Sequence, residues 1–493
     1  MEIPQNIFRT KSVIEIQHEL AAGASAGVSL KRHLGATSLV LFGVGVLIGA
    51  GIFSLTGMAA GQYAGPGIML SFVISAVACA LAGLCYAEFA SMVPVAGSAY
   101  TYAYTTLGEF FAWIIGWDLV LEYAAGAATV ATSWSAYLMK FCEQLGIPLP
   151  VQWAASPFSV MTSPDGGQVH GIFNAPAAFI VAVMSVVLIK GIRESAMLNA
   201  VLVALKVFVI LSFIGLGWSY INPANHQPFI PPNTGEFGHF GWSGVFRGAA
   251  VIFFAYIGFD AVSTAAQEAK NPKRDMPVGI LGSLALCTLL YCAFAYVLTG
   301  LANYKEFSGL SGLAPVAVAI SHTPYKFFTL LVELAILAGF SSVIMILLLG
   351  QSRVFYSMSQ DGLLPATFSE VHPRFRTPWK SNALFGVLVG LFAGLVPGHI
   401  IGEMTSIGTL LAFVIVCVSV PMLRRSMPEA ERPFRVPLVP WIPTAGALSC
   451  LAIMVSLPGE TWLRLIGWLL LGFVIYFAYS RNNSRLNPAS RGR

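Results

Sequence analysis

The sequence predicts an all-α membrane protein with 12 transmembrane helices. Hydrophobic residues make up 56% of the 493-residue chain and charged residues only 10%, whereas soluble domains carry about 25% charged residues. About twelve apolar runs are also long enough to cross a hydrocarbon core, which takes roughly 20 helical residues. We expect these spans at 38–58, 67–91, 106–138, 173–190, 196–219, 242–267, 278–302, 327–357, 382–397, 404–424, 440–458 and 461–480.

The apolar runs also suggest how the chain is organised, because no soluble domain interrupts them. The segment 139–172 is the longest stretch expected outside the membrane on the side opposite to the termini. The first span is too long for a signal sequence and should remain as an anchor. We expect a cytoplasmic N-terminal tail at 1–37, a first repeat at 38–219, a second repeat at 242–424, two further helices at 440–480 and a cytoplasmic C-terminal tail at 481–493.

The distribution of basic residues predicts the orientation. With a cytoplasmic N-terminus, 21 of the 27 Lys and Arg residues fall in inner segments and five in outer segments. This bias places both termini in the cytoplasm by the positive-inside rule and puts Cys142 near the outer surface. The concentration of Lys and Arg in the cytoplasmic segments explains the formal net charge of +5. A nucleic-acid partner is therefore not needed to explain this charge.

Enzyme classes find little support in the sequence. The Walker motif GxxxxGK[ST] and the zinc motif HExxH are both absent from the chain, and no nucleophile motif is present, so we predict neither an enzyme nor a cofactor or metal. A channel is the distant alternative, because no filter motif or charged ring is found. The oligomeric state is not predicted.

The first span has an unusual centre. Gly43, Gly45, Gly49 and Gly51 lie in what should be a helix interior, where each glycine costs about 1 kcal/mol relative to alanine. Close helix packing is one explanation. However, Gly49 lies about 18 Å into the span at 1.5 Å per residue, near the bilayer midplane. We therefore expect a break there, with backbone open to a ligand, so that a valine at Gly51 would block the site without unfolding the bundle.

The sixth span repeats the anomaly, with Gly258 and Asp260 deep in an apolar run. The second anomaly comes five spans after the first. A repeat with an odd number of spans is inverted relative to its copy, so this spacing predicts two inverted repeats with a binding site where the broken helices meet. Free amides at a half-helix N-terminus suit a carboxylate, and free carbonyls suit an ammonium group. Amino acids present both groups.

Five ionisable residues within the spans stand out as functional candidates, because each charged group in the hydrocarbon region costs at least about 2.5 kcal/mol. Lys206 in the fifth span is too deep to reach the interface easily, so it could carry a proton or replace a metal ion. A structural ion pair is the alternative. Asp118 and Glu122 share one face of the third span because they are four residues apart. Asp260 and Glu333 complete the set, and a polar packing role remains open for each acid. Glu88 and Glu109 lie toward the inner ends of their spans, where we expect solvated or helix-capping roles.

Several motifs together resemble the amino acid–polyamine–organocation superfamily, and within it the cationic amino acid transporter branch with short bacterial-type loops. The resemblance covers about residues 30–435. Its most specific pieces are GVGVLIGAGIF at 43–53, CYAEF at 85–89, PVAGSAYTY at 94–102, FAYIGFDAVS at 254–263, EAKNPKRDMP at 268–277, GQSRVFY at 350–356 and SQDGLLP at 359–365.

The resemblance implies a five-helix inverted-repeat fold with discontinuous helices 1 and 6. It further implies secondary active uptake of amino acids with protons, by alternating access, and a preference for arginine or lysine. A neutral amino acid or polyamine permease or exchanger is the alternative. The implied partners are the amino acid, the proton and the lipid bilayer of the cell membrane.

The resemblance also assigns residues. The substrate carboxylate would meet the amides of Gly49, Ala50, Gly51 and Ile52, and the amine would meet carbonyls near Phe254, Ala255 and Ile257. Asp260 would help to bind a basic side chain, Glu122 would face the site, and Lys206 would stand where sodium-dependent relatives hold sodium. Ala50 departs from relatives that carry a hydroxyl there. Ser341 and Ser342 match hydroxyl ligands of those relatives, so sodium coupling stays open.

Overall fold

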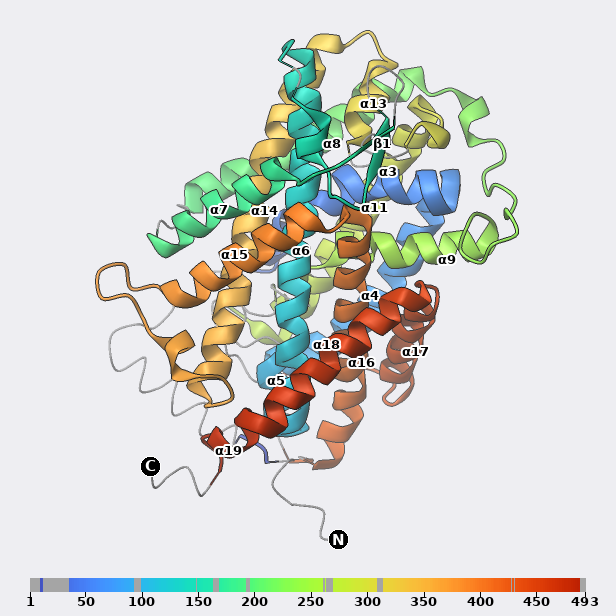
Figure 1. The fold of residues 1–493 in the computed structure, drawn as a ribbon. Coiled ribbons are helices and arrows are strands. Elements are labelled where there is room, and N and C mark those ends of the chain that lie inside the picture. Colours follow the sequence, from blue (N-terminus) through green and yellow to red (C-terminus); the bar gives the residue numbers. More distant parts are fainter. Residues whose placement is uncertain are drawn as a thin grey trace.

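The computed structural model describes residues 9–11, 35–92, 99–147, 149–162, 168–191, 196–259, 262, 269–307, 314–426, 428–429 and 431–487. Helices dominate this part of the chain (Figure 1). A short antiparallel hairpin, β1 (Val160–Thr162) with β2 (Gln168–His170), lies between the third and fourth expected spans. The apolar pattern of the sequence does not predict this hairpin.

In the first half of the chain, helices occupy the five expected spans with ends shifted by a few residues. The elements are α2 (Ala36–Leu47), a π-helical turn (Gly51–Leu55), α3 (Thr56–Ala59), a second π-helical turn (Ala60–Ala64), a 3-10 turn (Gly65–Gly67), α4 (Ile68–Met92), α5 (Ala99–Thr106), α6 (Glu109–Gln144), a 3-10 turn (Val151–Ala154), α7 (Ala175–Ile189) and α8 (Ala196–Gly217).

The second half follows the same pattern, with short turns between the long helices. Its elements are 3-10 turns (Trp218–Tyr220 and Pro223–His226), α9 (Gly241–Ile252), a 3-10 turn (Phe253–Tyr256), α11 (Pro272–Leu301), a 3-10 turn (Tyr304–Glu306), α13 (Pro315–Ser321), α14 (Lys326–Gln360), a 3-10 turn (Ala366–Ser369), α15 (Trp379–Leu395), α16 (Gly398–Ser426), α17 (Trp441–Val455), α18 (Gly459–Ile475), a π-helical turn (Tyr476–Ser480) and α19 (Arg481–Asn483).

Seven helical segments in the described ranges are long and apolar enough to cross a membrane. They are Gly51–Met92, Glu109–Gln144, Ala200–Tyr220, Lys273–Leu301, Phe328–Gln360, Gly398–Ser426 and Gly459–Asn483. Four shorter apolar helices accompany them, namely α2, α7, α15 and α17. The mostly helical membrane architecture is thus confirmed, and seven of its spans are clear from length and composition.

Local signals explain where several of these helices begin. The Asn174 side chain accepts a hydrogen bond from the Ala177 amide at 3.2 Å and caps α7, as asparagine often does at a helix start. Proline occupies the first turn of α7 and of α11, where its missing amide proton costs nothing. Gly108, with φ of 96°, precedes α6. Polar and conformational signals therefore fix the helix starts even in a mostly apolar sequence.

Small residues bring the helices close together around the first span. Gly43 of α2 faces Ser283 of α11, and Gly279 and Gly282 of α11 face Leu39 and Val40 of α2. A Cβ at any of these three glycines would lie 2.6–2.8 Å from its neighbour. Close approach through small residues is typical of helix packing in membranes. Consequently α11 lies directly along the first half of the first span.

The described residues nearest the two termini, 9–11 and 481–487, lie at the same end of the bundle, near α5 and α19 (Figure 1). Near the N-terminus, Lys11 forms an ion pair with Asp361 at 3.2 Å, and the Arg9 carbonyl accepts a hydrogen bond from the Glu109 amide. Near the C-terminus, the Arg485 amide donates to the Asp361 carbonyl at 3.0 Å. The two ends therefore contact the same residue.

Candidate functional site

The first span is interrupted in the middle of the bundle. Helix α2 ends at Leu47, and Ile48 has extended backbone with φ of −74° and ψ of 104°. The chain becomes helical again in the turn that starts at Gly51. Among the described residues, no hydrogen bond from the amides of 49–52 is found. Four N–H groups are thus available at the start of a helical segment, which is a favourable place for an anion.

The sixth span is interrupted at a matching place. After α9 the chain tightens into the 3-10 turn Phe253–Tyr256, and Ile257 is extended with ψ of 134°. Gly258 follows with φ of 108°, a conformation that glycine adopts far more readily than other residues. The Phe254 carbonyl accepts a hydrogen bond from the Ile257 amide at 3.1 Å. The turn therefore presents its backbone at the break instead of continuing α9.

The two breaks touch each other, and Gly51 is the point of contact. A Cβ on Gly51 would lie 2.7 Å from the Ala255 backbone nitrogen and nearer still to its Cα. At Gly49, in contrast, the nearest atom would be a Val343 methyl carbon at 3.5 Å. The sequence explained Gly51 by ligand access, whereas the structure shows that Ala255 backbone fills this space. A side chain at Gly51 would therefore disturb the packing of the breaks themselves.

Tyr291 of α11 joins the two breaks, and sequence reasoning missed it. Its hydroxyl lies 2.9 Å from the Leu47 carbonyl and 3.1 Å from the Ala255 carbonyl. The side chain is fully buried. Tyrosine in an apolar run gives no signal of its own, because its hydroxyl acquires a role only through partners that are distant in the sequence.

Lys206 lies in α8 with only 4% of its surface exposed. Its aliphatic carbons cover Gly339 of α14, where a Cβ would lie 3.1 Å from the Lys206 Cε. One turn earlier, Val203 packs on Gly45 of α2. The Lys206 side chain therefore contacts α14, and its helix α8 packs on α2 through Val203.

The acids of the third span are buried on one face of α6, as their spacing predicts. Asp118 is fully buried, and neither of its carboxylate oxygens has a hydrogen-bond partner among the described residues. It faces Gly408 of α16, where a Cβ would lie 3.1 Å from the Asp118 Oδ1. Glu122 is 2% exposed. The third predicted acid, Asp260, lies outside the described residues.

Three other acids, Glu88, Glu109 and Glu333, are buried and accept hydrogen bonds from side chains. Glu88 is fully buried and accepts two hydrogen bonds from Arg424, at 3.1 and 2.7 Å. Glu109 is also fully buried and accepts from Ser484 and Tyr476. Glu333 is buried as well and accepts from Gln144 at 2.8 Å. Neither Glu88 nor Glu109 is solvated, because loops and the C-terminal segment cover the span ends. Glu109 does lie in the first turn of α6, where an acid suits the start of a helix.

Comparison with known proteins places these features in a family. The profile of the amino acid permease family matches residues 34–478. This chain belongs to that family, within the amino acid–polyamine–organocation superfamily. It is accordingly a multi-pass membrane permease and not an enzyme, as the sequence predicts.

Individual relatives carry different substrate names. The branched-chain amino acid permease BcaP of Bacillus subtilis (strain 168) is 44% identical over 482 residues, which cover 98% of this chain and 99% of that protein. The methylthioribose transporter of the same organism is 40% identical with the same coverage. The chloroplastic cationic amino acid transporter 9 of Arabidopsis thaliana is 38% identical over 423 residues, 85% of this chain and 71% of that protein. The family is thus shown, and the substrate preference is not.

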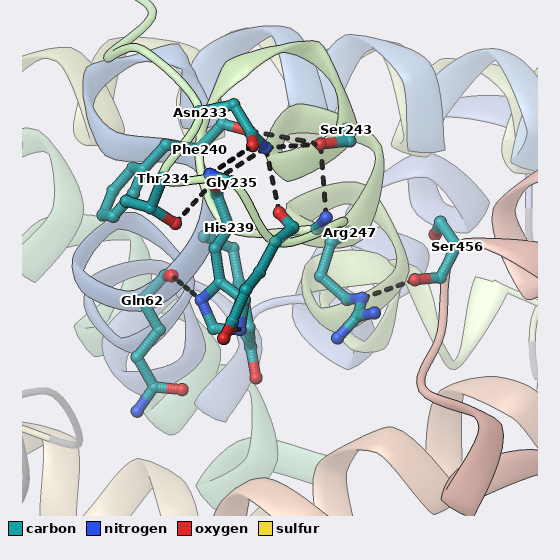
Figure 2. A network of polar contacts seen from close by, with 12 residues as sticks. Gln62, Asn233, Thr234, Gly235, His239, Phe240, Ser243, Arg247 and Ser456 are labelled. Carbon is teal, nitrogen blue, oxygen red and sulfur yellow. Dashed lines mark hydrogen bonds and ion pairs between the residues drawn. The ribbon is translucent and has the colours of Figure 1, made fainter.

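A polar cluster joins α9 to the segment between α17 and α18 (Figure 2). Arg247 of α9 donates to the Ser456 carbonyl and lies over the Tyr63 ring, 5.7 Å from its centre. The Glu403 carboxylate of α16 accepts from Tyr63 at 3.5 Å and from Thr461 at 2.7 Å. These contacts join the segment after the break in the first span, and α9 before the break in the sixth span, to the C-terminal part of the permease.

Proposed function

We propose that this permease is a secondary active transporter that takes up L-amino acids together with protons by alternating access. The observation that carries the proposal is the contact between the two breaks. Among the residues that the structure describes, the amides of 49–52 have no hydrogen-bond partner, and Gly51 lies against the backbone of Ala255. A zwitterion fits such a pair, because amides at a helix start attract a carboxylate and backbone carbonyls attract an ammonium group.

The proposal includes a topology. Twelve spans would form two inverted five-helix repeats at 38–219 and 242–424, with helices 1 and 6 discontinuous and both termini in the cytoplasm. Shared contacts of both terminal segments with Asp361 support a common side for the termini. Cys142, a half-buried free thiol, should react with an impermeant thiol reagent in intact cells. Labelling of a cysteine placed at the C-terminus under the same conditions would refute this topology.

Proton coupling is proposed to depend on Lys206. A buried cation beside Gly339 occupies the region where sodium-dependent relatives would hold an ion. Ser341 and Ser342 of α14 each donate to their own helix backbone at 2.9 Å, and their oxygens remain the ligands that the alternative of sodium coupling would use. Lys206→Ala should abolish accumulation driven by a pH gradient in liposomes while ligand binding remains measurable. Lys140 offers a control, because it forms an ion pair with Glu143 at the surface of the protein. Lys140→Ala should leave accumulation intact. A Lys206→Ala protein that still concentrates substrate under a proton gradient alone would contradict the coupling role.

A cationic substrate is the first candidate for the side chain. Asp118, Glu122 and Asp260 are three acids in the spans against one cation, Lys206, in a medium that disfavours uncompensated charge. A basic amino acid would supply positive charge. Asp260→Asn should then weaken arginine or lysine by about 2–5 kcal/mol if the pair is desolvated, and should leave alanine nearly unchanged.

A branched-chain substrate is the second candidate, and a separate observation favours it. The side chains nearest the breaks are apolar and buried, namely Ile52, Phe254 and Ile257. Asp118 packs against Gly408 without a polar partner among the described residues, so it gives no sign of being arranged for a cation. Sequence similarity to a branched-chain amino acid permease is consistent with such a pocket.

One competition experiment separates the candidates. Binding of arginine, lysine, leucine, isoleucine and alanine is compared in the wild type and in Asp260→Asn. Preference for arginine or lysine that is lost in the variant supports the cationic proposal. Wild-type preference for leucine or isoleucine supports the second candidate and ends the cationic one. Absence of binding by every amino acid in the wild type would refute amino acid uptake itself.

A further inference from the structure

Tyr291 is placed where a single side chain can control both breaks. Helix α11 packs along α2 through Gly279 and Gly282, so its position relative to the first span is tightly fixed. From this helix the Tyr291 hydroxyl reaches the Leu47 carbonyl at the end of α2 and the Ala255 carbonyl in the turn of the sixth span. The last carbonyls of a helix lack partners within that helix. Tyr291 therefore supplies a donor at a point where the broken helix leaves an acceptor.

A hydroxyl has one proton, whereas each carbonyl oxygen has two lone pairs. Tyr291 must consequently share its proton between Leu47 and Ala255 or alternate between them. In either case the Ala255 carbonyl keeps a lone pair that can accept from a substrate ammonium group. The same contact fixes how far this carbonyl lies from the amides at 49–52, because the Ala255 backbone is packed against Gly51.

We propose that the Tyr291 hydroxyl fastens the two breaks to each other and so sets the spacing between the amides that meet the substrate carboxylate and the carbonyl that meets its amine. Tyr291 is thus a positioning residue of the substrate site, and this role rests on the proposed transport function. Without the hydroxyl, the two breaks separate more readily, and a substrate that needs both of them binds less tightly.

Tyr256 provides a matched control for this proposal. It is fully buried like Tyr291, and the two rings lie 5.6 Å apart. Its hydroxyl also has two acceptors, the Phe72 carbonyl at 3.0 Å and the Thr288 hydroxyl at 3.1 Å. Neither acceptor belongs to the first break. Tyr256→Phe therefore removes an equally buried pair of hydrogen bonds but removes no hydrogen bond to the first break.

The test compares the wild type, Tyr291→Phe and Tyr256→Phe in two measurements. Hydrogen exchange followed by mass spectrometry reports the opening of peptides at 44–53 and 252–259, because exchange reflects local opening of a structure. It needs no substrate. The affinity for the amino acid that the competition experiment shows to be preferred reports the spacing between the amides of 49–52 and the Ala255 carbonyl. Tyr291→Phe should accelerate exchange at both breaks together and weaken binding about tenfold. Tyr256→Phe should leave exchange at the first break unchanged.

A rescue variant guards against a simple loss of folding. Replacement of Tyr291 by p-aminophenylalanine puts two N–H donors in the same place and should restore exchange and affinity. The proposal is overturned if Tyr291→Phe leaves exchange at either break unchanged, if Tyr256→Phe opens the first break equally, or if p-aminophenylalanine restores nothing. Failure of the wild type to bind any amino acid would refute the proposed function, whereas the exchange measurement would still decide whether Tyr291 fastens the breaks.

Discussion

The two interrupted spans use glycine for different physical reasons. At the first break Gly51 has no side chain because the Ala255 backbone occupies that position, and Gly49 has room around it. At the break in the sixth span Gly258 has φ of 108°. Glycine is needed there because it adopts this backbone conformation far more readily than other residues. The break in the first span offers amides without a hydrogen-bond partner in the described part of the chain, and the break in the sixth span offers a turn whose carbonyls are partly engaged. A glycine in a membrane span therefore indicates a break only together with the atoms that surround it.

The largest effect is expected from Gly51→Ala, which attacks the contact between the breaks. An added methyl group would meet Ala255 backbone, which cannot rotate away. Overpacking of this kind costs about 1–3 kcal/mol, and we expect the upper end of that range. Thermal melting of the purified protein should fall clearly, together with loss of transport. Unchanged melting with lost substrate affinity would instead favour the ligand-access explanation that the sequence suggested.

Sequence reasoning succeeded where a signal is local and failed where it is not. Length and composition predict the long spans, and Gly49, Gly51 and Gly258 mark both breaks, because helix propensity is a property of the segment itself. Nothing local reveals that the Tyr291 hydroxyl reaches Leu47 and Ala255, or that Arg424 covers Glu88. Those contacts join residues that are hundreds of positions apart or lie on different helices, so only the folded chain defines them.

A smaller effect is expected from Gly258→Ala, which tests the conformational requirement of the sixth break. Alanine at φ of 108° would be strained, and backbone strain of this type costs about 1–3 kcal/mol. The added Cβ would also lie 2.6 Å from a Val46 methyl carbon. That methyl group belongs to a side chain and can move, so steric repulsion adds little.

The measurement is again thermal melting, with Val46→Ala as the partner variant. If strain dominates, Gly258→Ala should destabilise the protein to the same extent with or without Val46→Ala. If the double variant Gly258→Ala, Val46→Ala recovers stability, steric crowding governs both breaks, as it does at Gly51. The two glycines would then be required for the same physical reason.

The smallest effect on stability is expected from Gly49→Ala, and it separates the two glycines of the first break. Its Cβ would lie 3.5 Å from Val343, an ordinary contact distance, and Gly49 is not among the positive-φ glycines. Stability should therefore change by no more than about 0.5 kcal/mol, as for substitutions without steric conflict. The Gly49 amide nevertheless belongs to the four donors proposed to meet the substrate carboxylate, so a methyl group beside it should weaken amino acid binding several-fold. Melting and binding measured on the same preparation distinguish the cases. Normal melting with weaker binding supports a carboxylate at this break, whereas normal melting with wild-type affinity would move the carboxylate away from Gly49 and leave the amides of 50–52 as its donors.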